Sequence, residues 1–389
     1  MRTTPHRLAT LATLAAVMIA AACSDDAGDE STNATSTGGP ADESPTGVAA
    51  VCPDPLVIQT DWFPEAEYGA TYQLIGPDPE IDTAAKVVRG PLVTADGTET
   101  GIDVEVRTGG PAIAGGSVIE TMQTDRDVLL GYLNTDDQVR NYSQIATTAV
   151  VAPLEINPQV VMWDPASHPG VSAIADLQDD DVTIRYSANE SYMDFLVNSG
   201  QVRADQLDPS YDGSPAVFVA EGGAVAQQGF ATSEPFTYEF LIPEWGSPVS
   251  FELIHDTGWE TYSQSIGVLT ERLDDARPCL KAFVPLMQET IVAYANDPDE
   301  TNQLIVDVVA AFDDFWIYDL PLAEFSIEQQ LQIGIVDNGP NDTIGDFDLD
   351  RVADFLPLAV DVLAATDPPD DLTPDDLVTN EFIDTSIGL

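Results

Sequence analysis

The amino-acid sequence predicts an α/β protein built as two lobes. Strand-like and helix-like runs alternate along the chain, which is typical of α/β folds. The chain has 389 residues, 44% of them hydrophobic, so it can bury a large core. A chain of this length is expected to form two domains or one two-lobed unit.

Acidic residues greatly outnumber basic ones. Asp and Glu number 67 against 13 Lys and Arg, which gives a formal net charge of -54. Such a surface repels nucleic acid and anionic lipid headgroups, so we expect no nucleic-acid partner. Because salt screens charges over about 8 Å, a binding site still depends on its own local field. The overall acidity is typical of a solubility device or an adaptation to salt.

The first residues have the pattern of an export signal. Arg2 and Arg7 precede an apolar run over residues 8–22 that is too short to span a bilayer comfortably. The run ends in "MIAAACSDD", where three small residues stand directly before Cys23. This resembles a bacterial lipobox, so we expect a signal peptide over residues 1–22 and a lipid on Cys23. The alternative is a plain secretory signal with an incidental cysteine.

The next segment, residues 23–52, is small, polar and acidic. It cannot bury enough apolar surface to fold, so we expect a disordered tether. Lipid and tether together would hold the folded body at the outer face of the cell membrane, or in a periplasm. No other stretch of the sequence is apolar over a length that would span a bilayer.

Two cysteines remain beside the expected lipid site. Outside the cytoplasm, Cys52 and Cys279 are expected to form a disulfide. It would tie the start of the folded body to a helix late in the chain. The alternative is two separate thiols.

The first part of the folded body reads as strands that run into helices. Residues 56–62 are predicted to be a strand, and Pro64 suits the first turn of the helix that follows. Residues 85–93 and 101–107 are typical of a hairpin. Further elements are a Gly-Gly turn into a helix opened by Pro111, and a strand over residues 127–133 capped at Asn134 or Thr135.

The middle of the chain repeats this scheme after a crossover. Residues 148–165 form a nearly continuous apolar run, which we interpret as a crossing into another lobe. Residues 181–200 and 224–245 each predict a strand, a polar turn and a helix. Strands over residues 250–258 and 262–270 are expected to return to the first lobe. From Pro278 onward the chain is predicted to be mostly helical.

Several turns therefore have one form, an apolar strand followed by a small or polar turn and a helix start. Ligands of open α/β sheets bind beyond the carboxyl ends of the strands, where helix N-termini offer free N–H donors. The alternative is that these are merely capped turns. The candidate turns are residues 61–68, 109–113, 133–137, 187–192 and 232–238.

The motifs of common enzymes are missing. The sequence has no G-x-S-x-G elbow, no Walker A motif and no G-x-G-x-x-G fingerprint. Once the signal is removed, His168 and His255 are the remaining histidines, and the two remaining cysteines are expected to pair. We therefore expect no zinc or iron site and no cofactor.

Four segments in order resemble one family. They are "TDWFPEAEYGATYQL" after the first strand, "GFATSEPFTYEF", the long helix "LDDARPCLKAFVPLMQETIVAYANDPDE", and "DLVTNEFID" near the end. Together they resemble the solute-binding proteins of bacterial ABC importers, in the nitrate/sulfonate/taurine and thiamine-pyrimidine-precursor group. The resemblance covers roughly residues 53–389.

The resemblance implies a periplasmic-binding-protein-like type II fold, with the ligand held between two lobes by hinge closure. It implies a monomer that delivers its solute to a membrane permease and its ATPase. The expected limits are residues 53–151 for lobe 1 and 152–247 for lobe 2. Residues 248–389 are expected to return to lobe 1 and add the C-terminal helices.

Other functions remain as alternatives. The same fold includes a pyrimidine-precursor synthase, but that enzyme class uses a Cys-rich motif and metal-binding His, and neither is available here. We therefore expect that the protein is not an enzyme. A third possibility is a lipoprotein that signals or adheres and has lost transport.

The candidate ligand residues lie in the turns, with Trp62 the strongest of them. Their alternative roles are core packing and solvated helix starts. Aromatic faces and carboxylates suit a pyrimidine-like heterocycle or an amine. The turns hold no Lys or Arg, apart from the nearby Arg185, which disfavours nitrate or taurine. The candidates are Asp61, Trp62, Glu67, Tyr68, Tyr132, Asn189, Glu190, Tyr192, Glu234 and Tyr238.

Overall fold

The computed structural model describes residues 47–113, 117–179, 181–188, 190–314 and 316–389. The expected signal peptide, Cys23, most of the expected tether and Asn189 lie outside the described residues. The expected tether extended to residue 52, which is too far, because residues 47–50 already belong to the folded body. Gly47–Ala50 form a 3₁₀ helix, η1, whose Val48 side chain is buried in the core because it is apolar.

Seven strands within the described residues form the first sheet, in the order β2-β3-β4-β1-β5-β12-β6. The strand β1 is parallel to β4 and β5, whereas β12 is antiparallel to β5 and β6. The predicted hairpin is confirmed as the antiparallel pair β3 and β4. The strands are β1 (Leu56–Gln59), β2 (Glu80–Asp82), β3 (Val87–Val93), β4 (Glu99–Arg107), β5 (Val128–Leu133), β6 (Thr147–Val151) and β12 (Ser265–Leu269).

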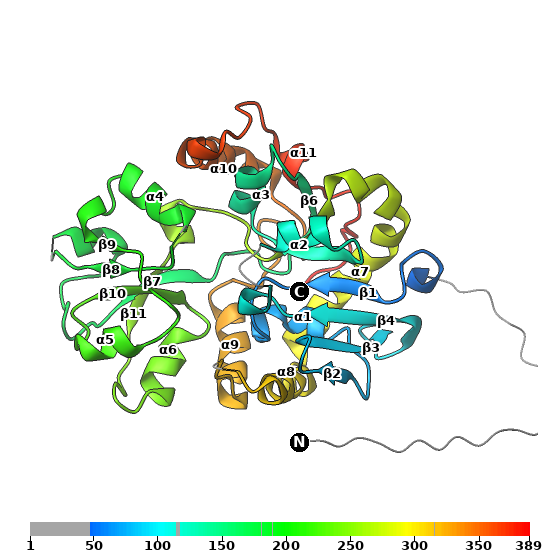
Figure 1. Ribbon diagram of the computed structural model, residues 1–389, viewed down its shortest axis with the longest axis horizontal. Coiled ribbons are helices and arrows are strands. Elements are labelled where there is room, and N and C mark those ends of the chain that lie inside the picture. Colours follow the sequence, from blue (N-terminus) through cyan, green and yellow to red (C-terminus); the bar gives the residue numbers. More distant parts are fainter. Residues whose placement is uncertain (1–46, 114–116, 180, 189, 315) are drawn as a thin grey trace, which may run out of the picture. The chain divides into compact units, whose positions relative to one another are not determined.

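A second sheet of five strands has the order β11-β7-β10-β8-β9 (Figure 1). In it β7 is antiparallel to β10 and β11, and β8 is parallel to β9 and β10. We call the first sheet with its helices lobe 1, and the second sheet with its helices lobe 2. The strands are β7 (Gln159–Trp163), β8 (Ile184–Arg185), β9 (Leu207–Asp208), β10 (Ala226–Phe230) and β11 (Ser250–Leu253).

Helices cover both sheets, so the α/β class predicted from the alternation is confirmed (Figure 1). From Leu273 onward the described chain contains helices but no strand, which confirms the predicted helical C-terminal part. The α-helices are α1 (Gly69–Tyr72), α2 (Val118–Thr124), α3 (Thr135–Asn141), α4 (Ser191–Asn198), α5 (Ala216–Ala220), α6 (Glu234–Phe236), α7 (Leu273–Asn296), α8 (Asp299–Phe312), α9 (Leu320–Gln332), α10 (Leu349–Val362) and α11 (Pro374–Leu377).

Helix starts differ from several predicted positions. Pro64 precedes its helix, because Glu65 is extended and the 3₁₀ helix η2 begins only at Ala66. Pro111 lies in the short 3₁₀ helix η3 (Gly110–Ile113), as the Gly-Gly turn predicted. The helix α2 begins later, at Val118, where Ser117 caps it by accepting a hydrogen bond from the Glu120 N–H. Asn134 occupies the predicted N-cap position of α3, but its side chain makes no capping hydrogen bond, and its Oδ1 accepts from the Gln264 N–H instead.

Two segments cross between the lobes. Residues 152–158 join β6 to β7, and residues 254–264 join β11 to β12. We call them the crossing segments. The expected return to lobe 1 at residue 248 is too early, because β11 pairs with β7 in lobe 2. An apolar strand does not reveal its sheet until its pairing partner is known.

Arg351 of α10 joins the two crossing segments. Its guanidinium donates to the Glu155 carbonyl at 2.7 Å and to the Glu155 carboxylate at 3.2 Å. It also donates to the carbonyls of Glu260 at 2.9 Å and Thr261 at 3.1 Å. The guanidinium lies over the Tyr262 ring, 3.9 Å from its centroid. One side chain therefore holds residues of both crossing segments.

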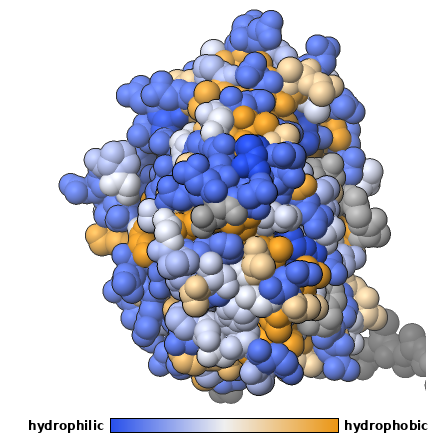
Figure 2. All heavy atoms as spheres, turned by 90° about the vertical axis from the view of Figure 1, so that its left-hand side faces the viewer, coloured by the Kyte–Doolittle hydropathy of each residue, from blue (hydrophilic) through white to orange (hydrophobic). Residues whose placement is uncertain are grey.

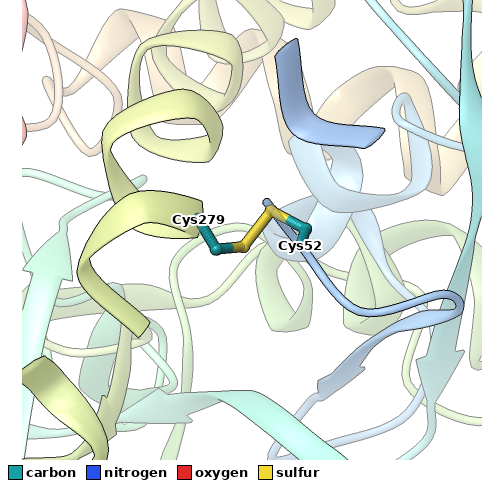
Figure 3. The surroundings of a disulfide bond; sticks show 2 residues. All are labelled: Cys52 and Cys279. Atoms are coloured by element: carbon teal, nitrogen blue, oxygen red, sulfur yellow. A yellow bond between two sulfur atoms is a disulfide. The ribbon is translucent and has the colours of Figure 1, made fainter. Parts of the chain in front are cut away.

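A disulfide joins Cys52, which follows η1, to Cys279 of α7 (Figure 3). This is the pairing that the sequence analysis expected. It closes a loop across 227 residues of sequence. A cross-link over such a long loop restricts the unfolded chain strongly.

The outer surface is mainly hydrophilic on the face seen in Figure 2, with smaller hydrophobic patches. Among the described residues, no helix combines the length and apolar character needed to cross a bilayer.

We predict that Cys279→Ser lowers the free energy of unfolding by about 2–5 kcal/mol, because the reduced chain regains loop entropy. Urea denaturation with and without reductant measures this change. The control is the double variant Cys52→Ser/Cys279→Ser, which reductant should not affect. Equal stability of the oxidised protein and the double variant would contradict the prediction.

We predict that Arg351→Gln lowers the free energy of unfolding by about 3 kcal/mol, because it leaves the Glu155 carboxylate without its cationic partner. Adding Glu155→Gln to this variant should recover part of the loss. Chemical denaturation of both variants tests this, and a double variant no more stable than Arg351→Gln would count against the pairing.

Candidate functional site

The turns after several strands of both sheets line one cavity of about 520 Å³. Its walls include Asp61 beyond β1, Asn134 beyond β5, Ser187 beyond β8 and Ser233 beyond β10. This is the position where open α/β sheets bind ligands. Among the described residues, seven carboxylates and one arginine, Arg140, line the cavity; the carboxylates are Asp61, Glu65, Asp136, Asp137, Glu190, Asp212 and Glu234.

Two glycines hold the turn that carries Asp61 and Trp62. The Gly110 N–H donates to the Asp61 carbonyl at 2.8 Å, and the Gly109 N–H donates to the Trp62 carbonyl at 3.0 Å. A Cβ on Gly109 would lie 2.3 Å from the Thr60 carbonyl oxygen. The Gly-Gly turn at residues 109–113, predicted as a candidate ligand turn, therefore supports the neighbouring turn by close backbone approach.

Trp62 lies at the cavity wall and is 36% exposed. Its ring meets Trp316, which also lines the cavity, edge to face with 6.1 Å between the centroids. Phe63 stacks on Trp316 at 5.7 Å from the other side of the turn. The aromatic wall is thus supported by packing and still offers ring surface to a ligand.

Tyr68 positions the carboxylate of Asp61. The Tyr68 hydroxyl donates to Asp61 Oδ1 at 2.6 Å and accepts from Gln264 Nε2 at 2.9 Å. Burial raises the pKa of Asp61, although the hydrogen bond from Tyr68 partly opposes this rise. Tyr68 is fully buried, so it acts behind the wall rather than as part of it.

Two glutamates follow on the same turn. Burial raises the pKa of Glu65 well above its ordinary value, and repulsion from Glu67, Asp61 and Glu234 adds to this rise. Glu67 lies behind the cavity wall and accepts a hydrogen bond from Thr232, which follows β10. That bond joins lobe 1 to lobe 2.

Lobe 2 contributes Glu190 and Glu234. Gln228 Nε2 donates to Glu190 Oε1 at 3.2 Å, and the Ser187 N–H holds the Gln228 carbonyl oxygen at 2.7 Å. The Phe230 N–H donates to Glu234 Oε2 at 2.6 Å. Burial nevertheless raises the pKa of Glu190 to about 7 and that of Glu234 to about 7.

The start of α3 adds two aspartates. Ser191 of lobe 2 donates to Asp136, which forms a second hydrogen bond between the lobes. Burial and the charge of Asp136 raise the pKa of Asp137 to about 6. Arg140 lies 3.4 Å from Asp137 and opposes this rise. The one cavity arginine is therefore engaged by a carboxylate.

The second crossing segment contributes Ser263 and Gln264, which line the cavity and are 7% and 4% exposed. Among the described residues, Ser263 Oγ and Gln264 Oε1 have no hydrogen-bond partner. Gln264 has a φ of 54°, a left-handed conformation that is uncommon for a residue with a side chain. Such backbone strain concentrates at functional sites.

The predicted ligand residues fall into two sets. Asp61, Trp62, Glu190 and Glu234 line the cavity. The structure does not bring the other described candidates to its wall, because their side chains are buried in the cores or behind the wall. These are Glu67, Tyr68, Tyr132, Tyr192 and Tyr238.

Several cavity residues were missed as ligand candidates by sequence reasoning. Glu65, Asp136 and Asp137 lie in the candidate turns, but they were explained as acidic residues that stabilise the positive end of a helix. Gln228 lies in the middle of β10, whose sequence does not show which of its two glutamines faces the cavity. Ser263 and Gln264 give no signal in the sequence, because their position depends on the crossing of the chain. Among the described residues, no group of three or more His, Cys, Asp or Glu is placed to hold a metal ion.

Comparisons with known proteins find similarity in structure rather than in sequence. No family model matches the chain, and no curated protein matches it in sequence. A protein of Bordetella bronchiseptica RB50 is 14% identical, with a TM-score of 0.52 over 85% of this chain and 96% of that chain. The putative sulfonate-binding protein SsuA of Methylobacillus flagellatus KT is 12% identical, with a TM-score of 0.52 over 85% and 93%.

These comparisons correct one expectation. The solved structures of similar fold include the desulfurization enzyme DszB, 12% identical with a TM-score of 0.46 over 85% of this chain and 97% of that chain. Because one fold can serve both enzymes and binding proteins, the absence of enzyme motifs does not support the expectation that the protein is not an enzyme. The comparisons do confirm the predicted fold: the chain has the periplasmic-binding-protein-like fold.

We predict that the free energy of unfolding rises as the pH falls from about 8 to about 5. The carboxyls of Glu190 and Glu234 have a pKa of about 7, above their ordinary value. Their contribution to stability is therefore fully present below about pH 4.5 and is lost as the pH rises through about 7.

Urea denaturation across this range measures the slope. The double variant Glu190→Gln/Glu234→Gln is the control, because it keeps the overall acidity but removes both titrations. Its slope should be shallower than that of the wild type. Equal slopes would show that the general acidity of the protein, rather than the cavity, sets the pH dependence.

Proposed function

We propose that this protein is an extracytoplasmic solute-binding protein of an ABC importer that captures a small organic cation between its two lobes. The cation carries an amino group, either on an amine or on a pyrimidine-like heterocycle. The observation that carries the proposal is the cavity with seven carboxylates from both lobes and one arginine. The fold agrees with this role but does not by itself establish it.

The carboxylates explain why a cation fits. Burial and mutual repulsion raise the pKa of Glu65, so its charged form is disfavoured in the empty cavity. A bound ammonium group would relieve both the repulsion and the lost hydration, and it would donate hydrogen bonds to several carboxylates. Trp62 and Trp316 add aromatic surface, on which a cation or a heterocyclic ring can lie.

The same residues disfavour an anion. A sulfonate or nitrate would need positive charge, but the one arginine of the cavity already lies 3.4 Å from Asp137. The Methylobacillus protein is described as sulfonate-binding, but at 12% identity its likeness extends to the fold alone. The charge of this cavity therefore supports an amine over nitrate, taurine or another sulfonate.

The remaining parts of the proposal follow from this role. Lobe 1 comprises residues 47–151 and 265–389, and lobe 2 comprises residues 159–253, with the crossing segments as the hinge. Cys23 carries the lipid anchor, which holds the protein at the outer face of the cell membrane or in a periplasm. The protein works as a monomer. It passes its solute to a permease and its ATPase.

A thermal-shift screen of the purified protein tests the proposal, with amines, amino-pyrimidines, taurine and nitrate as probes. A ligand present at about 100 times its Kd should add about 2.7 kcal/mol of stability. We expect stabilisation by amino-bearing cations and none by taurine or nitrate. Stabilisation by taurine or nitrate, without any by a cation, would overturn the proposal.

The same screen includes two variants. Glu190→Gln should weaken binding of the identified cation about tenfold, or about 1.4 kcal/mol, because it removes one carboxylate of the cavity. Glu244→Gln is the matched control, since Glu244 also belongs to lobe 2 but is exposed and outside the cavity wall. It should leave the affinity unchanged.

A further inference from the structure

Six of the cavity carboxylates form two separate groups. The first, which we call the β1 group, contains Asp61, Glu65 and Glu234. The second, which we call the α3 group, contains Asp136, Asp137 and Glu190. Each group combines carboxylates of both lobes, and each lies next to one hydrogen bond that joins the lobes.

The bond between Thr232 and Glu67 brings the β1 group together. Thr232 stands two residues before Glu234, and Glu67 stands two residues after Glu65, so the bond holds their chain segments side by side. Accordingly, the charges of Asp61 and Glu234 both act on Glu65. A cation placed here would contact carboxylates from both lobes.

The bond between Ser191 and Asp136 does the same for the α3 group. Ser191 directly follows Glu190, and Asp136 directly precedes Asp137. The charges of Asp136 and Asp137 act on Glu190, and the charge of Asp61 also reaches Asp137. The two groups therefore lie beside different hydrogen bonds between the lobes.

Gln264 connects the two groups. Its Nε2 donates to the Tyr68 hydroxyl, which in turn donates to Asp61 of the β1 group. Its backbone N–H donates to Asn134 Oδ1 at 3.0 Å, and Asn134 Nδ2 lies 3.4 Å from Asp137 Oδ2 of the α3 group.

The remaining polar atom of this side chain has no protein partner. Gln264 is 4% exposed, and its Oε1 finds no hydrogen-bond donor among the described residues. A buried carbonyl oxygen without a donor is destabilising unless a ligand or water supplies one. This observation is independent of the carboxylates and also favours a ligand with N–H donors.

We propose that the cavity binds a dication with two amino groups, one at the β1 group and one at the α3 group, beside Gln264. The proposal rests on the proposed function and specifies its ligand class. A monocation would leave one group of carboxylates uncompensated, so it would bind more weakly. Trp62 and Phe230, which line the same cavity, offer apolar surface to the spacer between the two amino groups.

Isothermal titration calorimetry of the purified protein tests this with matched pairs of probes. Putrescine is compared with butylamine, and cadaverine with pentylamine, so that chain length is equal within each pair. We expect the better diamine to bind at least about 100-fold more tightly than its monoamine. Taurine serves as the anionic control.

Variants assign the two amino groups. Glu234→Gln in the β1 group and Glu190→Gln in the α3 group should each reduce the ratio of diamine to monoamine affinity about tenfold. Glu244→Gln, exposed and outside the cavity, should leave the ratio unchanged. The wild-type ratio is decisive even where a variant fails to fold.

The outcomes separate the two proposals. Equal affinities for a diamine and its monoamine would overturn the dication while leaving an amine-binding function in place. Binding of taurine without any amine would overturn the proposed function and the dication together. A ratio that falls only in the β1 variant would also overturn the dication, because the α3 group would then have no part in binding.

Discussion

The shared cavity imposes one constraint on the rest of the molecule: several carboxylates must lie close together with little water around them. Like charges in such a place raise one another's pKa and weaken the folded state. The structure meets this constraint in part with neutral donors, such as Tyr68 on Asp61, Gln228 on Glu190 and the Phe230 N–H on Glu234. Neutral donors orient a carboxylate without cancelling its charge, so these hydrogen bonds leave the cavity negatively charged wherever its carboxyls are ionised.

The overall acidity and the acidity of the cavity are different physical properties. A net charge of -54 is spread over the whole chain, where salt screens it within about 8 Å. In the cavity, the carboxylates are buried, so salt screens their charges much less and a few of them control the local electric field. For this reason the net charge of the chain did not indicate a class of ligand. The carboxylates gathered in the cavity, such as Asp137 near Glu190, do favour a cationic ligand.

Local patterns predicted much of the fold, and distant pairings account for what was missed. The β3–β4 hairpin and the start of α3 were predicted from alternation and from a residue type typical of the N-cap position, which are properties of neighbouring residues. The strand β11 was assigned to the wrong lobe because its partner β7 lies far away in the sequence.

In the site, Asp61 and Glu190 were predicted because they follow strands, and both line the cavity. The tyrosines were misleading, because an aromatic ring after a strand serves the core as readily as a cleft, and Gln264 depends on a left-handed backbone that its sequence does not reveal.

The position of Arg351 also orders events in time. Its bond to Glu155 links residues 196 positions apart, so the two crossing segments lack this link until α10 has been made and has docked. The disulfide likewise waits for α7, because its cysteines are 227 positions apart. A chain that leaves the ribosome from its N-terminus can thus form both sheets in part before Arg351 links the crossing segments. The link between the two crossing segments therefore forms only after α10 has been made, so the C-terminal helices take part in assembling the middle of the molecule.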